Sequence, residues 1–259
     1  MDTLIYNSSY ETIDASLTDG NVGCRKRRGC RDNIFVISAI SNSVVNDKFK
    51  PIQVQVTDIE KCFDKMWLQS CVNSLYEAGL RNDMLNLLYI ENKNALVAVK
   101  TNNNLSRRIP VKDVEIQGSV WAGLKCTAMM DTLNKTVMAD KSLQYYYKND
   151  KSIPIGVRGM VDDTLGISKC GTEAIKLNSL INSFVQTQRL TLSETKSVVV
   201  HIEHGLSIGV TNSSDLKSPF FGAEFDPNGC KNYEKKCLKK IIMILLKRYT
   251  KPITFVMIQ

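Results

Sequence analysis

The chain is poor in the residues that build zinc sites, and it lacks the long apolar runs that cross membranes. It has only two histidines, and its eight cysteines are scattered without a Cys-x-x-Cys pair, so a structural zinc site is not expected. No apolar run approaches the roughly eighteen residues of a membrane span, and no basic start leads into a signal-peptide core. We therefore expect an intracellular protein of nucleus or cytoplasm with free thiols, neither secreted nor membrane-bound.

Positive charge is in excess and is unevenly distributed. The formal net charge is +8, and residues 24–31 alone carry five basic side chains. A second basic group lies within residues 235–251. Such an excess favours a polyanionic partner, either nucleic acid or an anionic membrane surface, with an ordinary solvated surface as the structural alternative.

The hydrophobic pattern mixes helices with strands and hairpins. Ile52, Val54 and Val56 alternate with polar residues, which predicts a strand. Helical spacing or strand-like runs recur along the rest of the chain without an internal repeat. The predicted helices are 12–17, 32–46, 68–78, 82–89, 119–139, 172–185 and 238–245, with hairpins at 96–111 and 153–167 and a buried strand at 198–200. This mixture indicates an α+β fold.

Two adjacent carboxylates, Asp162 and Asp163, lie where strand-like residues turn back on themselves. Neighbouring side chains on a strand point to opposite faces, so one Asp would look into a cleft while the other lies at the turn. Carboxylates this close repel each other unless a cation or a proton lies between them. The pair is therefore either a metal site on a hairpin tip or a hydrophilic turn.

A second acidic segment and a Gln-Gly pair complete a pattern. Residues 58–64 read Asp-Ile-Glu-Lys-Cys-Phe-Asp after the predicted strand, and Gln117-Gly118 precede a helix. Together with Met160-Val161-Asp162-Asp163, these segments resemble the palm motifs of reverse transcriptases of the non-LTR (LINE-type) retrotransposons. Residues 192–196 resemble the fourth motif, 220–222 the primer grip and 23–35 the segment before the palm, so the resemblance runs from about Asn21 to Phe225. Met160 departs from the aromatic residue usual at its position, and Val120-Trp121 depart from the usual Pro-Leu.

The resemblance implies a role for each matching residue. Asp58 and Asp162 would bind Mg²⁺, or Mn²⁺ in its place, in a two-metal site that Asp163 supports. Lys196 would neutralise or protonate the leaving pyrophosphate, with a solvated lysine as the alternative. Phe63 would act as a steric gate against ribose, with core packing as the alternative. Gln117 and Gly118 would lie beside template and nucleotide. Backbone phosphate would be bound by Arg27, Arg28 and Arg31, and the primer by Phe221 and Gly222.

The implied architecture is a right-hand polymerase palm, an antiparallel sheet with packed helices, with partial fingers and the start of a thumb. Residues 1–50 would form partial fingers with the basic segment, 51–225 the palm with an insertion near 80–115, and 226–259 the start of the thumb. The implied activity is RNA-directed DNA polymerisation on an RNA template, a DNA primer and dNTPs, within a longer element-encoded polyprotein. The alternative is a catalytically inactive nucleic-acid-binding remnant or a fossil fragment of such an element.

Overall fold

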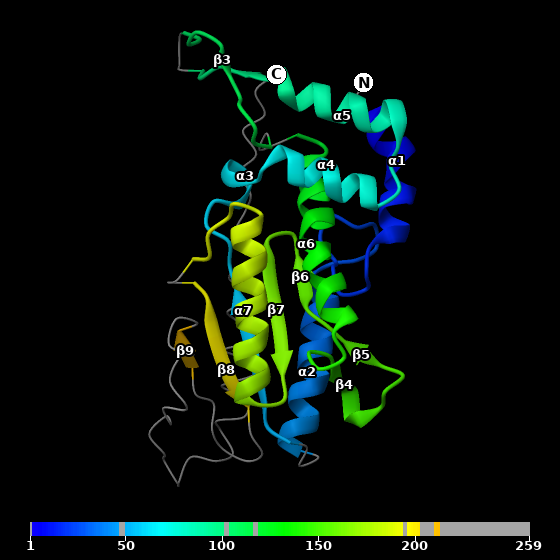
Figure 1. Ribbon diagram of the computed structural model, residues 1–259, viewed down its shortest axis with the longest axis vertical. Helices are drawn as coiled ribbons and strands as arrows, with labels where there is room; N and C mark the ends of the chain where they lie inside the picture. The colour runs from blue at the N-terminus through cyan, green and yellow to red at the C-terminus, as the bar shows by residue number, and fades with distance from the viewer. Residues whose placement is uncertain are drawn as a thin grey trace.

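The computed structural model describes residues 2–46, 50–100, 104–115, 119–193, 196–202 and 210–212. Within these ranges, helices surround a five-stranded antiparallel sheet, with two small hairpins beside it (Figure 1). The helices are α1 (Asp2–Ser16), α2 (Cys30–Asn46), α3 (Cys62–Lys65), α4 (Leu68–Glu77), α5 (Asn82–Lys93), α6 (Ala122–Ala139), the 3-10 turn η1 (Tyr147–Asn149) and α7 (Gly171–Thr187). The strands are β1 (Ile52–Thr57), β2 (Leu96–Val97), β3 (Ile109–Pro110), β4 (Tyr145–Tyr146), β5 (Pro154–Ile155), β6 (Arg158–Met160), β7 (Asp163–Ser168), β8 (Val198–Ile202) and β9 (Val210–Asn212).

The sheet is built around β1, although that strand comes first in the chain. The strand order is β6-β7-β1-β8-β9, so β1 pairs with two strands that follow it by a long stretch of sequence. In the register, Val56 lies opposite Leu165 of β7 and opposite Val198 of β8. Directly opposed residues share a face of the sheet, so this register aligns the alternating apolar positions of the three central strands.

Helices cover both faces of this sheet. Ile37, Ile40 and Val44 of α2 pack on the face that carries Val54 and Val56. On the opposite face, Gln55 Nε2 donates a hydrogen bond to Asn178 Oδ1 of α7 at 2.6 Å. Figure 1 shows α7 in front of the strands, with α6 beside it. The fold is therefore the expected antiparallel sheet with packed helices, sandwiched between α2 and the α6–α7 pair.

The N-terminal helix is longer than the sequence pattern predicts. Helical spacing indicates only residues 12–17, whereas α1 spans Asp2–Ser16. Tyr10, Ile13 and Leu17 are buried against side chains of α4, α5 and α6. This packing supplies the helical stability that a mostly polar segment lacks on its own.

Most other predicted elements are found, with shifted ends. Helix α6 begins at Ala122 and not at Ser119, whose Oγ accepts a hydrogen bond from the Trp121 amide at 3.2 Å. The second strand of the hairpin predicted at 96–111 shortens to the two residues of β3, and Pro110 lies there opposite Leu96 of β2. The predicted helix at 238–245 lies outside the described residues.

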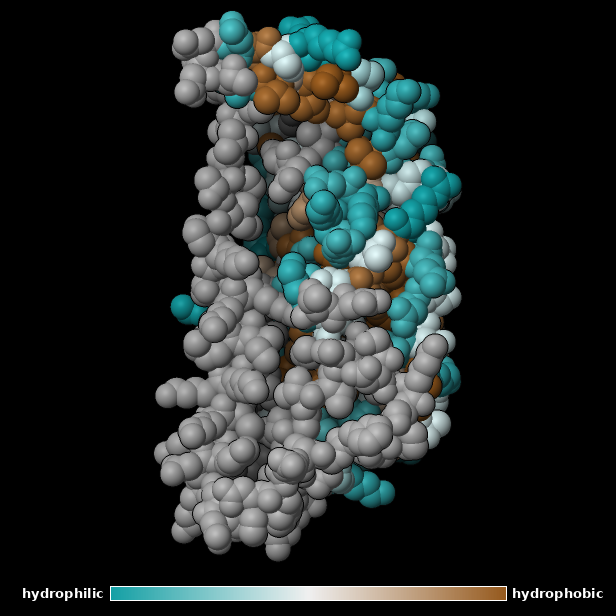
Figure 2. Space-filling view, turned by 90° about the vertical axis from the view of Figure 1, so that its left-hand side faces the viewer, coloured by the Kyte–Doolittle hydropathy of each residue, from teal (hydrophilic) through white to brown (hydrophobic). Residues whose placement is uncertain are grey.

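One end of the molecule carries exposed apolar side chains. Figure 2 shows them gathered where Figure 1 places α5 and the β2–β3 hairpin. The exposed apolar residues of these elements are Leu87, Ile90, Leu96, Val97 and Ile109. All five residues fall within the insertion predicted near 80–115.

Cysteines and long apolar helices can be followed within the described residues. The six cysteines described there are all free. No described helix combines the length and the apolar character that crossing a bilayer requires.

Candidate active site

Three aspartates lie at the same end of the central strands. Asp58 follows the last residue of β1, and Thr57 pairs with Thr164 of β7, so Asp58 comes next to the start of β7 at Asp163. The β6–β7 hairpin closes with Met160 opposite Asp163, which leaves Val161 and Asp162 as its two-residue turn. The topology therefore brings together carboxylates about a hundred residues apart in sequence, with Asp162 at the turn and Asp163 on the strand.

The turn that carries Asp162 has an unusual backbone. Val161 adopts a φ of 60°, in the left-handed region that β-branched residues rarely enter. Such a conformation costs of order 1–3 kcal/mol and persists only where the surroundings impose it. The surroundings here include Gly23, where a Cβ atom would collide with the Val161 amide nitrogen. Gly23, in the segment 23–35, therefore lies in close contact with the tip of the β6–β7 hairpin.

Asp58 is buried and bears an ion pair. Its Oδ2 lies 3.0 Å from Nζ of Lys196, a side chain that is 62% exposed. Main-chain contacts fix the Asp58 backbone, because its carbonyl accepts a hydrogen bond from the Ser193 amide at 2.8 Å and its amide donates to Ser197 Oγ at 3.3 Å. Ser193, Lys196 and Ser197 therefore all contact the aspartate that the sequence predicts for the site.

The Asp162 carboxylate acts electrostatically on two thiols, Cys24 and Cys126 of α6. Burial raises the pKa of the Cys24 thiol, and the Asp162 carboxylate raises it further, whereas a hydrogen bond with Thr127 lowers it. A hydrogen bond with the Cys62 thiol, followed by burial, raises the pKa of Cys126, and Asp162 adds to that rise as well. The thiols of Cys24 and Cys126 are therefore held in the neutral form.

The carboxylates match a hard divalent cation by chemistry. Mg²⁺ prefers oxygen ligands and is commonly held by one or two carboxylates with substrate phosphates and water. Within the described residues, no group of three or more His, Cys, Asp or Glu side chains is gathered as a complete metal site. The carboxylates thus fit Mg²⁺ by ligand type alone, because the three aspartates are not gathered into one metal-binding group among the described residues.

Of the other predicted substrate-binding residues, the structure describes some and not others. Phe63 lies on α3, half-buried, and packs against the core cluster that Val161 also borders, so its expected packing role is present. Gln117, Gly118, Phe221 and Gly222 lie outside the described residues.

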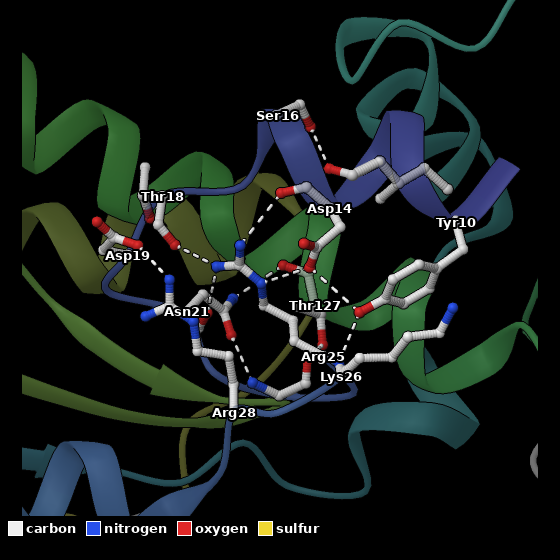
Figure 3. Close-up of polar contacts among 12 residues, drawn as sticks. Tyr10, Asp14, Ser16, Thr18, Asp19, Asn21, Arg25, Lys26, Arg28 and Thr127 are labelled. Atoms are coloured by element: carbon white, nitrogen blue, oxygen red, sulfur yellow. Dashed lines mark hydrogen bonds and ion pairs between the residues drawn. The ribbon is translucent and has the colours of Figure 1, made fainter.

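The basic side chains of residues 24–31 differ in whether they form ion pairs. Arg28 Nη2 pairs with Asp19 Oδ1 at 2.7 Å, and Figure 3 shows this pair at the edge of a larger polar network. Arg27 and Arg31 are exposed, and neither forms an ion pair with any other described residue. Of the three arginines predicted to touch phosphate, these two are the ones available to a polyanion.

Sequence reasoning missed Arg25, the most constrained residue of this segment. Its guanidinium donates to Asp14 Oδ1 at 2.7 Å, to the carbonyls of Thr18 and Asn21 at 2.8 and 2.9 Å, and to the Asp14 carbonyl at 3.1 Å (Figure 3). These contacts tie α1 to the loop that leads into the basic segment. No sequence signal distinguishes Arg25 from its basic neighbours, because its partners depend on tertiary structure.

Solved structures share this fold at low sequence identity. Apo telomerase from Candida tropicalis, truncated from its C-terminal domain, matches with a TM-score of 0.55 and 15% identity, covering 83% of this chain and 44% of that one. Telomerase from Candida tropicalis in complex with a fragment of telomeric RNA matches with a TM-score of 0.55 and 13% identity, covering 94% of this chain and 45% of that one. The chain thus spans less than half the length of these structures. No curated protein matches it.

The sequence itself matches the reverse transcriptase (RNA-dependent DNA polymerase) family over residues 5–251, which extends beyond the predicted resemblance at both ends. The match takes in most of α1 and the three aspartates Asp58, Asp162 and Asp163. This chain belongs to the reverse transcriptase family of RNA-directed DNA polymerases.

Proposed function

We propose that this chain is the polymerase domain of a retrotransposon of the non-LTR (LINE) group and extends a DNA primer on an RNA template. The observation that carries the proposal is the meeting of Asp58 with the Asp162–Asp163 hairpin at one end of the central strands. The order of the sequence motifs supports the LINE assignment. The telomerase likeness supports the fold alone, because identity is only 13–15%.

Asp58 and Asp162 would hold the divalent cations, with Asp163 supporting the site. When bound, two such cations stabilise the attacking and the leaving oxygens of a phosphoryl transfer. The protein's own part is to bring the carboxylates together through the β1–β7 register. Lys196 would contribute a positive charge or a proton from Nζ to the departing pyrophosphate, since its largely exposed side chain already reaches the Asp58 carboxylate.

Substrate contacts would come from the residues around this centre. Phe63 follows Asp58 by five residues, and a ring there would press against the sugar C2′ position and favour dNTPs. Gln117 and Gly118 would face template and nucleotide, and Phe221 and Gly222 the primer end. Arg27 and Arg31, joined by Arg28 if Asp19 releases it, would bind backbone phosphate.

The domain division follows from the same proposal. Residues 1–50 would serve as partial fingers, 51–225 as the palm with its insertion near 80–115, and 226–259 as the start of a thumb. The remaining fingers and thumb would be supplied by other parts of a polyprotein. The exposed apolar residues of the insertion favour contacts with further protein there, because exposed apolar patches mark interaction sites.

A second candidate function is nucleic-acid binding without catalysis. It is favoured by the Asp58–Lys196 ion pair, since a lysine on the carboxylate competes with a cation for the same oxygen. The net charge of +8 would still provide salt-dependent binding to a polyanion.

Primer extension tests the proposal directly. The assay is dNTP incorporation on oligo(dT)-primed poly(rA) with Mg²⁺ or Mn²⁺, comparing wild type with Asp162→Asn. Asp83→Asn is a matched control, because it removes the same charge from an exposed position on α5. We expect incorporation by wild type and by Asp83→Asn, and a loss of at least about a hundredfold in Asp162→Asn.

Two outcomes would count against the proposal. Equal incorporation by Asp162→Asn and wild type would show that the hairpin carboxylate takes no part. Absence of incorporation by wild type, together with binding that weakens steeply with salt, would favour the binding remnant.

A further inference from the structure

An exposed aromatic ring lies on the outer side of α2, close to two arginines. Phe35 is 74% exposed, and the only other exposed aromatic side chain among the described residues is Tyr76, whose ring the Arg81 guanidinium covers at 3.8 Å. Arg27 and Arg31 are also exposed, and neither forms an ion pair with a described residue. An apolar ring and two positive charges therefore face water at the start of one helix.

The helix places Arg31 and Phe35 side by side. They are four residues apart on α2, and side chains at this spacing are neighbours on a helix surface, with Cβ atoms about 5–6 Å apart. Ile37 and Ile40 lie on the opposite side of the helix, where α2 packs on the sheet. Phe35 thus takes no part in the core, and its ring is directed to solvent beside a guanidinium.

The start of α2 is fixed to the hairpin that carries Asp162. Asn33 Nδ2 donates to the Gly159 carbonyl at 3.0 Å, and Asn33 Oδ1 accepts from Arg158 Nε at 2.9 Å. Both partners belong to β6, which turns into β7 through Asp162. The face formed by Arg31 and Phe35 is therefore held at a defined place beside the candidate active site.

The chemistry of this face favours an unpaired strand of nucleic acid. Arginine binds phosphate through charge-assisted hydrogen bonds, and an exposed ring stacks on a nucleobase. Asp32 is the acidic residue in the first turn of α2, and its carboxylate accepts a hydrogen bond from the Gly29 amide at 3.0 Å. A duplex would offer phosphates to the arginines but hides the faces of its bases, so only an unpaired strand suits both the ring and the charges.

We propose that Phe35 is a stacking residue for an unpaired nucleobase, with Arg31 and Arg27 on the adjoining phosphates. The site takes single-stranded RNA or DNA of any sequence, because every base has a π-face and phosphate contacts carry no sequence information. The inference deepens the proposed function and rests on it only for the identity of the strand as template or primer. Stacking itself requires neither catalysis nor a metal ion.

Binding without catalysis tests the inference. Fluorescence anisotropy is followed with short fluorescein-labelled oligonucleotides as unpaired RNA, as unpaired DNA and as duplex, in EDTA and over a range of salt. The variants are Phe35→Ala, Phe35→Leu, which keeps apolar volume but lacks the ring, Phe35→Trp, which keeps a ring, and Arg31→Ala. Leu4→Ala is the matched control, because Leu4 on α1 is exposed to the same 74%. Melting temperatures confirm that each variant is folded.

We expect Phe35→Ala and Phe35→Leu to bind unpaired strands about 5- to 100-fold more weakly than wild type, with duplex binding unchanged. Neither removes a charge, so the slope of log affinity against log salt should stay as in wild type, whereas Arg31→Ala should lower it by about 0.7. Phe35→Trp should retain affinity, and its added fluorescence should be quenched on binding. Leu4→Ala should behave as wild type.

Several results would overturn the inference. Unchanged affinity in Phe35→Ala would make this ring a protein contact or an ordinary surface residue, and full affinity in Phe35→Leu would show that stacking is not involved. An equal loss on duplex, or no binding of unpaired strands by wild type, would count against it as well. Absence of dNTP incorporation would refute the proposed function but leave these binding measurements intact, so the two failures are distinguishable.

Discussion

Replacing Arg25 by alanine should destabilise the fold far more than replacing its neighbour Arg27. The Arg25 side chain is only 6% exposed and donates four hydrogen bonds, one to the Asp14 carboxylate and three to carbonyls of residues 14, 18 and 21. Alanine would leave these acceptors without their donors. Arg27 is exposed, so its removal should change the free energy of unfolding by less than about 0.5 kcal/mol.

The magnitude follows from the surroundings of Arg25. Hydrogen bonds to charged groups are worth about 1.5–3 kcal/mol each, but they do not add, and breaking a buried ion pair costs about 3–5 kcal/mol. Asp14 is 31% exposed and regains water when its partner is lost, which lowers the cost. We therefore expect Arg25→Ala to reduce the free energy of unfolding by about 3 kcal/mol, and Arg25→Lys to recover only a part, since one ammonium lacks the planar fork.

Urea unfolding followed by tryptophan fluorescence measures this difference, with Arg27→Ala as the matched control. Nucleic-acid binding as a function of salt gives the complementary result. Arg27→Ala should lower the slope of log affinity against log salt by about 0.7–0.9, whereas Arg25→Ala should leave it unchanged under conditions where it is folded. A loss of less than about 1 kcal/mol for Arg25→Ala would refute the view that Arg25 is a structural arginine.

Two further predictions concern the hairpin tip and the α6–α7 connection. Gly23→Ala should displace Val161 and abolish most primer extension, because the added Cβ atom meets backbone; Gly29→Ala, with open space around it, should extend primers normally. The Asp140 carboxyl has its pKa lowered to about 2 by its hydrogen bond to Lys176, and a depressed pKa stabilises the fold above the unfolded value. The stability difference between wild type and Asp140→Asn should therefore be full above about pH 4 and shrink toward pH 2, and a pH-independent difference in urea midpoints would contradict this.

Local patterns predicted individual elements better than their assembly. The alternation of Ile52, Val54 and Val56 correctly indicates β1, but polar residues between them suggest a strand with one solvated face. Gln53 and Gln55 are in fact buried, because α7 covers that face and offers Asn178 as a hydrogen-bond partner. Likewise, α1 owes its length to packing on α4, α5 and α6, which no local pattern reports.

The candidate site was predictable where adjacent residues carry the signal. A hairpin with one Asp of the pair at its turn follows from a strand-like run on each side of Asp162-Asp163. Its pairing with β1 does not follow from the residue pattern, nor does the ion pair between Asp58 and Lys196, because both depend on the order of strands in the sheet. The roles of Asp58, Asp162, Asp163 and Lys196 stay predictions.

The central position of β1 also governs when this protein can fold. Its partners begin at Asp163 and Val198, so the first strand made by the ribosome has no neighbour until more than a hundred further residues have been added. At about 5–20 residues per second, that delay is roughly 5–20 s. During it, the sequence Ile-Gln-Val-Gln-Val-Thr presents two unpaired edges, which makes the nascent chain prone to aggregation and suited to chaperone binding. Expression yield should therefore depend on slow synthesis and on chaperone supply more than on the stability of the finished fold.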